Sequence, residues 1–164
     1  FNEINAAITR EQIKRLDRIL AALRQTRSTF LTEINLPIGF KFINSNDENG
    51  NCGVCFLIQA ENVDDAKRLE AIMGKHLTVH RPINSGRHVY SAWGVINGKA
   101  GGHNPAWDCF RHPKNRKIKT NYRRPLRQTD DYLKRTVLCN TPYGWNKRNT
   151  GKAIETINKQ IAKL

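Results

Sequence analysis

Residues 39–80 show a pattern that few folds can accommodate, with two short apolar strands joined by a polar turn. Phenylalanines alternate with other residues in 39–43, and a second alternating segment occupies 53–60. The stretch between them is polar and contains Asn49-Gly50, a pair typical of hairpin turns. Because strands joined by a hairpin run antiparallel, we predict an antiparallel pair.

A helix and a third strand follow this pair. Asn62 is expected to cap the helix, whose inner face is formed by Val63, Ala66, Leu69, Ile72 and Met73, and Gly74 is expected to end it in the C′ position. A third strand is predicted over 76–80. An amphipathic helix must cover an apolar surface, so the pattern predicts an α/β fold with a small, mostly antiparallel sheet.

Long amphipathic segments flank this unit at both ends of the chain. Apolar residues recur at steps of mostly three to five positions over the first 34 residues, which predicts one long helix ending before Pro37. A second apolar stripe over 149–164 predicts a C-terminal helix. Near 130–138 a helical turn and a short strand are expected.

Periodicity weakens from Pro82 to Leu126, where Gly, Pro, Asn and basic residues dominate. No acid occurs between Asp108 and Asp130, although the chain as a whole has 28 Lys+Arg, 14 Asp+Glu and a formal net charge of +14. Such a segment is either a solvated basic loop or a site for phosphate or carboxylate groups. A long loop of this kind is usually functional or covered by a partner.

Four cysteines raise the question of a metal site. Cys52 and Cys55 form one C-x-x-C pair, and Cys109 with His112 could supply a second. The wide separation of the two pairs argues against a zinc site, so we predict no metal and read the cysteines, Cys139 included, as free thiols in a reducing, cytoplasmic environment. No apolar run approaches the length of a membrane span.

The opening segment NEINAAITREQIKRLD, residues 2–17, resembles the linker helix of the DegT/DnrJ/EryC1/StrS family of sugar aminotransferases, which are fold-type I enzymes dependent on pyridoxal phosphate. The later order is also similar: a hairpin, a helix like 64–73, a proline turn like Arg81-Pro82-Ile83, an irregular loop, a segment like 132–138 and a final helix. The resemblance implies a linker helix at 1–35 and a small domain at 36–164, with a basic loop at 97–128.

The resemblance also implies an activity. Such enzymes transfer an amino group from glutamate or glutamine to a keto sugar, using pyridoxal 5'-phosphate held on a lysine as a Schiff base. The lysine and the phosphate site belong to a large domain expected upstream of this chain, so no catalytic or cofactor-binding residue is assigned here. The implied protein is a cytoplasmic homodimer whose substrate is an anionic keto sugar, either nucleotide-linked or a sugar acid.

In this family the proline turn and the loop after it face the sugar. The corresponding substrate-binding candidates are His80, Arg81, Asn84, His88, Trp107, Arg111, Arg116 and Arg123. Trp107 could stack on a ring, and the arginines could hold a phosphate or carboxylate through two hydrogen bonds. For His80 and His88 we prefer a structural reading, as a polar residue at a strand end and a structural hydrogen bond, whereas Trp107 could equally well be a loop anchor.

Two other functions remain open. The C-x-x-C pair, the histidines and a sequence pI of about 10.1 also suit an HNH-like zinc nuclease or a basic nucleic-acid-binding protein, although nucleic acid is not our expected partner. The chain could also be a non-catalytic, aminotransferase-like assembly module. Stoichiometric zinc would favour the nuclease, and a lysine-bearing large domain in the same reading frame would favour the enzyme.

Overall fold

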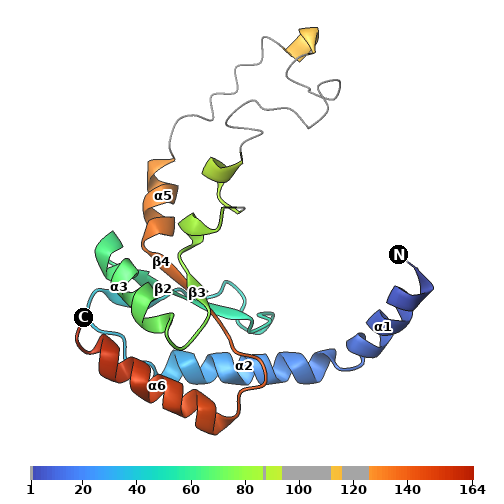
Figure 1. The fold of residues 1–164 in the computed structure, drawn as a ribbon, viewed down its shortest axis with the longest axis horizontal. Coiled ribbons are helices and arrows are strands. Elements are labelled where there is room, and N and C mark those ends of the chain that lie inside the picture. Colours follow the sequence, from blue (N-terminus) through green and yellow to red (C-terminus); the bar gives the residue numbers. More distant parts are fainter. Residues whose placement is uncertain (1, 87, 94–111, 116–125) are drawn as a thin grey trace. The chain divides into compact units, whose positions relative to one another are not determined.

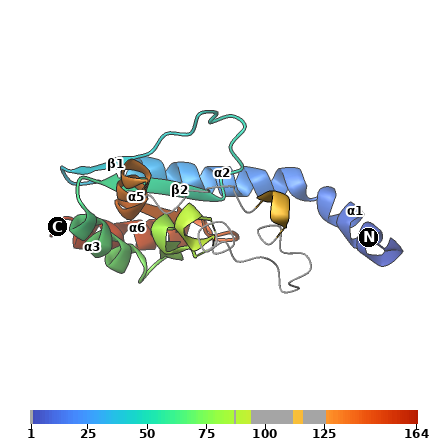
Figure 2. The same cartoon turned by 90° about the horizontal axis from the view of Figure 1, so that it is seen from above.

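A computed structural model describes residues 2–86, 88–93, 112–115 and 126–164. Within these residues the chain forms two units: Phe1–His80 together with Arg135–Leu164, and Arg81–Lys134. Figure 1 shows the elements along the chain, and Figure 2 shows the same cartoon turned by 90°.

The first unit is built on a four-stranded antiparallel sheet. Its strands are β1 (Phe40–Phe42), β2 (Cys55–Ala60), β3 (Val79–His80) and β4 (Thr136–Asn140), in the order β1-β2-β4-β3. β2 and β4 form the longest pairing, with Phe56 opposite Cys139 and Ile58 opposite Val137. The predicted α/β class with a small antiparallel sheet is therefore confirmed.

Helices α2 (Leu16–Glu33), α3 (Val63–Met73) and α6 (Lys147–Ile161) cover one face of this sheet. The core joins Phe30 of α2 to Phe56 of β2, whose rings stack with their centroids 5.3 Å apart. Alternate strand residues contribute to the same cluster, which also holds Leu69 of α3 and Ile157 of α6. Each such fully buried side chain stabilises the fold by roughly 2 to 3 kcal/mol through burial. Figures 1 and 2 show α2 and α6 side by side.

The predicted single N-terminal helix is two helices. α1 (Glu3–Ile13) ends at Lys14, and α2 begins after Arg15. Both residues keep right-handed backbone angles, and the amide of Arg15 donates to the carbonyl of Gln12 at 3.0 Å. The break is thus a local tightening to an i−3 hydrogen bond, which the apolar periodicity does not reveal. No side chain of α1 is buried.

The hairpin of β1 and β2 is confirmed, but its turn is not the tight one that Asn49-Gly50 predicts. The connection runs over 43–54, and Gly50 is not among the glycines with positive φ. Gly74 likewise does not adopt a left-handed C′ conformation: it is the C-cap of α3 with φ −64°. A Cβ there would lie 2.9 Å from the carbonyl oxygen of Glu70, so close approach is what requires glycine at this position.

Other predicted elements are shorter or shifted. Only Val79 and His80 of the predicted 76–80 strand pair with β4. The C-terminal helix α6 begins at Lys147, two residues before the predicted start at 149. Its N-cap is Asn146, whose side chain accepts a hydrogen bond from the amide of Asn149 at 2.8 Å. Asn62 caps α3 as predicted, accepting from the amide of Asp65 at 2.9 Å.

The second unit contains short elements. These are the 3-10 turns η1 (Pro82–Asn84), η2 (Tyr90–Ala92) and η4 (Pro113–Asn115), and the helix α5 (Arg127–Lys134). In the described part of the chain, no helix combines the length and apolar character that crossing a membrane requires.

Candidate functional site

The proline turn after β3 is an ordered structure in the second unit. Arg81 precedes η1, whose closing hydrogen bonds run from the amide of Asn84 to the carbonyl of Arg81 at 2.9 Å and from Ser85 to Pro82 at 3.0 Å. Pro82 favours this start because its ring fixes φ near the required value. The Arg81 guanidinium also donates to the carbonyl of Lys134, at a long 3.5 Å. The turn therefore contacts the end of α5.

The four described candidates from the sequence fall in different places. Arg81 and Asn84 share the proline turn, and His88 is an exposed residue in the next bend, where its amide donates to Oγ of Ser85 at 3.3 Å. His80 belongs to the first unit, half-buried in β3 opposite Leu138. The structure thus brings Arg81 and Asn84 together in one turn. The position of His80 is instead fixed by the pairing of β3 with β4.

Trp107, Arg111, Arg116 and Arg123 lie outside the described residues, as does most of the predicted basic loop at 97–128. Their assignment to substrate binding stays a prediction. Within this segment the structure describes residues 112–115 and 126–128, and the amide of Lys114 donates to Nδ1 of His112 at 3.3 Å.

A tyrosine that the sequence analysis missed ties the second unit together. The hydroxyl of Tyr90 donates to Oδ2 of Asp130 at 3.0 Å and accepts from the amide of Leu126 at 2.7 Å. This pair joins η2 to the start of α5, across 40 residues of sequence. No local sequence pattern points to this pair, because its two members are 40 residues apart.

Of the C-x-x-C pair, Cys52 lies in the 43–54 connection and Cys55 is the first residue of β2. Cys52 is exposed and Cys55 is partly buried, while Cys139 is buried in β4. Burial raises the pKa of the Cys139 thiol, and the nearby Cys55 adds to the effect, so Cys139 is a weak nucleophile and metal ligand. No group of three or more His, Cys, Asp or Glu side chains suited to a metal occurs among the described residues.

The described residues do not fit a role as holder of pyridoxal phosphate. All lysines in the described ranges are exposed. A Schiff-base lysine needs a depressed pKa, which burial in an apolar pocket or a second cation provides. The cofactor's chemistry is therefore not assigned to any of these lysines.

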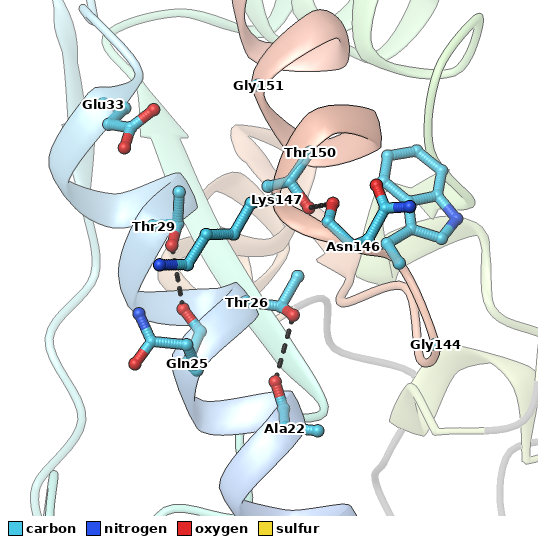
Figure 3. Close-up of a pocket in the computed structure, with 11 residues that line it drawn as sticks. Ala22, Gln25, Thr26, Thr29, Glu33, Gly144, Asn146, Lys147, Thr150 and Gly151 are labelled. Carbon is cyan, nitrogen blue, oxygen red and sulfur yellow. Dashed lines mark hydrogen bonds between the residues drawn. The ribbon is translucent and has the colours of Figure 1, made fainter.

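A cavity of about 640 Å³ separates α2 from the start of α6 (Figure 3). Gln25, Thr29 and Glu33 line it from α2, and Asn146 and Lys147 line it from the other side. The Lys147 side chain extends toward α2 in Figure 3. The hydroxyls of the lining threonines already donate to carbonyls four residues earlier, which leaves their oxygens as acceptors. The sequence analysis did not find this cavity, because it requires the packing of two helices far apart in sequence.

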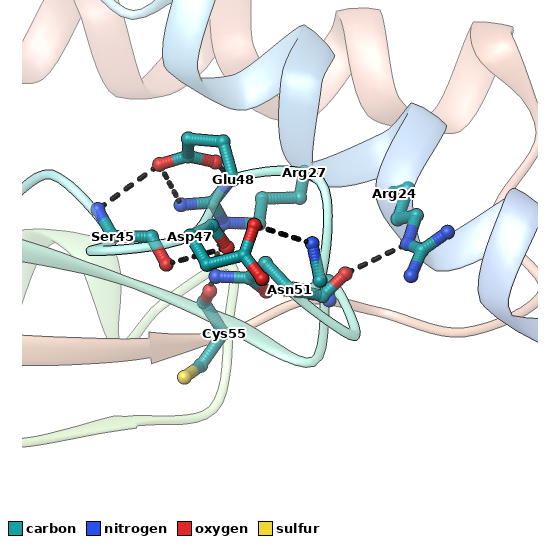
Figure 4. A network of polar contacts seen from close by, with 9 residues as sticks. Arg24, Arg27, Ser45, Asp47, Glu48, Asn51 and Cys55 are labelled. Carbon is teal, nitrogen blue, oxygen red and sulfur yellow. Dashed lines mark hydrogen bonds and ion pairs between the residues drawn. The ribbon is translucent and has the colours of Figure 1, made fainter.

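The 43–54 connection is fixed to α2 by a polar network (Figure 4). Arg27 is only 8% exposed; its Nη1 and Nη2 donate to Glu48 at 2.7 and 3.3 Å, and its Nε donates to the carbonyl of Cys55 at 3.1 Å. The Arg27 hydrogen bond, followed by the amide of Ser45, lowers the pKa of Glu48. These hydrogen bonds give the buried guanidinium of Arg27 its partners and hold the 43–54 connection against α2. We therefore regard the role of this network as structural.

The described candidate site is therefore the turn carrying Arg81 and Asn84, tied to α5 and followed by the exposed His88. It presents a guanidinium, an amide and an imidazole, which are groups that bind oxygen-rich anions. No protein-family model and no curated protein matches the chain.

Proposed function

We propose that this chain is the small domain of a pyridoxal-phosphate-dependent sugar aminotransferase, cytoplasmic and dimeric, in which a large domain or companion chain supplies the cofactor site. The observation that carries the proposal is the order of elements along the chain. The described elements follow the order that the resemblance implies: helix, hairpin, helix, strand, proline turn, helix, strand and C-terminal helix. No single motif in the chain is as specific as this complete order.

The proposed role of this domain is substrate contact. The proline turn offers Arg81 and Asn84 at the start of the segment that faces the sugar in the proposed family. A net charge of +14 favours a substrate with negative charge through long-range attraction. We therefore propose a keto sugar that carries phosphate or carboxylate, with glutamate or glutamine as the amino donor.

The product of the complete reading frame tests the proposal. We expect it to transfer an amino group from glutamate or glutamine to a nucleotide-linked or acidic keto sugar, only when pyridoxal phosphate is present. Borohydride reduction followed by peptide mapping should find the cofactor on a lysine outside residues 1–164. A complete protein without such a lysine, and without a partner chain that carries one, would overturn the proposal.

The substrate role of the turn has its own test within that protein. Arg81→Ala should raise KM for the anionic sugar about tenfold, as expected for loss of a charge-assisted hydrogen bond, and should leave KM for the amino donor nearly unchanged. Arg148→Ala removes one exposed positive charge from α6 and serves as the matched control. Equal KM values for the sugar in both variants would remove Arg81 from the site.

A further inference from the structure

The solvent-facing side of α6 carries a line of positive charge. Arg148, Lys152 and Lys159 of the helix are exposed, and so is Lys163, which lies in the turn that follows it. Because an α-helix has about 3.6 residues per turn, the three helical cations fall within about 40° of one another around its axis. The residues that α6 buries lie on the opposite side, with Ile157 near their centre. These four cations, the α6 stripe, therefore point away from the core.

Little of this charge is neutralised within the fold. Glu155 is the one acid of α6; it lies in line with the stripe and pairs with Lys159, whose Nζ is 2.6 Å from its Oε1. Neither Arg148 nor Lys152 forms an ion pair with a described acid. Lys147 is not part of the stripe, because its side chain extends toward α2 (Figure 3). The N-terminal half of the stripe therefore keeps its full positive charge.

The cations occupy positions that are unfavourable for an isolated helix. The N-terminus of a helix carries a partial positive charge, so acids stabilise the first turn and cations destabilise it. The first turn of α6 has no acid and begins with Lys147 and Arg148. Arg148 and Lys152 also form a like-charged pair four residues apart, which lowers stability further. Helix α3 shows the opposite arrangement, with Asp64 and Asp65 in its first turn. Charges that lower stability on an exposed face indicate a role other than folding.

The chemistry of the stripe indicates a polyanion as its partner. No large apolar side chain within α6 is exposed, so the stripe has no apolar anchor beside it. A protein interface has an apolar centre, and a membrane-surface helix inserts an apolar face, which α6 has already buried in the core. The phosphate backbone of nucleic acid needs cations alone, because each contact releases a condensed counterion. From Arg148 to Lys163 the stripe extends about 22 Å along the axis, long enough to contact several phosphates.

We propose that the α6 stripe binds the phosphate backbone of nucleic acid without regard to base sequence. The net charge of +14 does not by itself distinguish this partner from an anionic sugar, whereas the alignment of cations on one exposed face does. The guanidinium of Arg148 and the ammonium groups of the three lysines donate to phosphate oxygens. The stripe lies in the first unit and needs neither the proline turn nor pyridoxal phosphate. Its binding is therefore independent of the proposed transfer of an amino group.

Fluorescence anisotropy of a labelled short DNA duplex, titrated with the complete protein at several salt concentrations, measures this binding. We expect the double variant Arg148→Gln/Lys152→Gln to bind more weakly and to make the slope of log K against log salt shallower by about 2. Arg10→Gln/Arg18→Gln removes two exposed cations from α1 and α2, and should leave the slope unchanged. Equal changes in the two double variants would overturn the stripe as the site. So would a preference for one duplex sequence over another, or equally tight binding of polyglutamate.

Arg148→Glu separates a binding role from a structural one. The introduced carboxylate would lie in the first turn of α6 and pair with Lys152 four residues later, and both effects stabilise a helix. We expect this variant to melt at the wild-type temperature or higher, and to bind the duplex about tenfold more weakly. A lower melting temperature would show that Arg148 stabilises the fold, and unchanged binding would show that it does not contact phosphate. Either result would contradict the proposal.

Discussion

The guanidinium of Arg27 donates through two nitrogens to the carboxylate of Glu48, at 2.7 and 3.3 Å, while its third nitrogen donates to the carbonyl of Cys55. One almost fully buried side chain thereby holds both the 43–54 connection and the first residue of β2. The side chain of Glu48 remains 52% exposed, so the two partners differ in what their loss should do.

Arg27→Ala should lower the free energy of unfolding by about 2 kcal/mol, because the carbonyl of Cys55 and the Glu48 carboxylate both lose a donor. Chemical denaturation measures this change. Arg18→Ala removes an exposed arginine of the same helix and should change stability little. Equal losses in the two variants would mean that the network does not hold the connection.

Stability should depend on pH through Glu48. The pKa of this carboxyl is lowered in the folded state, mainly by Arg27. Its contribution is therefore fully present above the ordinary glutamate pKa and is lost as the pH falls through the lowered value. Wild type should be more stable than Glu48→Gln at neutral pH, and the two should converge as the pH falls below the lowered pKa of Glu48. The lowered pKa values of Asp64 and Glu155 act equally in both proteins and cancel.

Among the described glycines, Gly53 is expected to be the least tolerant of substitution. Its φ is +75°, and a Cβ there would lie 2.6 Å from the backbone nitrogen of Arg24. Gly53→Ala should cost more than about 2 kcal/mol, since left-handed backbone alone costs about 1 to 2. Gly144→Ala, with φ +81° and open space around it, should show only the backbone cost. Equal melting temperatures for the two variants would contradict the close approach between Gly53 and the backbone of Arg24.

Tyr90→Phe should loosen the second unit. The variant removes the hydroxyl that bonds Asp130 and the amide of Leu126, so the amides at the start of α5 should exchange with deuterium several-fold faster. Tyr143→Phe, which alters an exposed tyrosine of the first unit, is the control. Unchanged exchange in α5 would mean that other contacts hold its N-terminal end.

Thiol reactivity should follow burial. Of the three described cysteines, Cys52 is exposed and should react first with iodoacetamide, whereas Cys139 is fully buried with a raised pKa and should react only after unfolding. Peptide mapping of the alkylated protein measures the order. Rapid labelling of Cys139 under native conditions would show that β4 opens locally.

Much of the fold can be predicted because each segment has a clear period. The α3 stripe is correct in its buried members Ala66, Leu69 and Met73, and the C-terminal stripe includes the buried Ile154 and Ile157. Features that depend on individual hydrogen bonds cannot be predicted from the spacing of apolar residues. The break at Lys14–Arg15 leaves the apolar spacing intact, and the long hairpin connection is set by Arg27, which is remote in sequence.

The candidate site could be predicted only in part. A proline after a strand predicts the turn that carries Arg81, and the structure places Asn84 in the same turn. The partners of such residues come from elsewhere in the chain, as Lys134 does for Arg81 and Asp130 does for Tyr90, and a local pattern contains no information about them. The same holds for the cavity between α2 and α6, whose walls are far apart in sequence.

The central position of β4 in the sheet has a consequence for synthesis of the chain. β2 is complete once Ala60 has been made and can pair with β1, but its partner on the other side is Thr136–Asn140. At about 5 to 20 residues per second, a ribosome leaves the apolar edge of β2 without its partner for several seconds. Nascent chains are then open to pairing with one another, so we expect yield to fall when synthesis is slowed within residues 81–134.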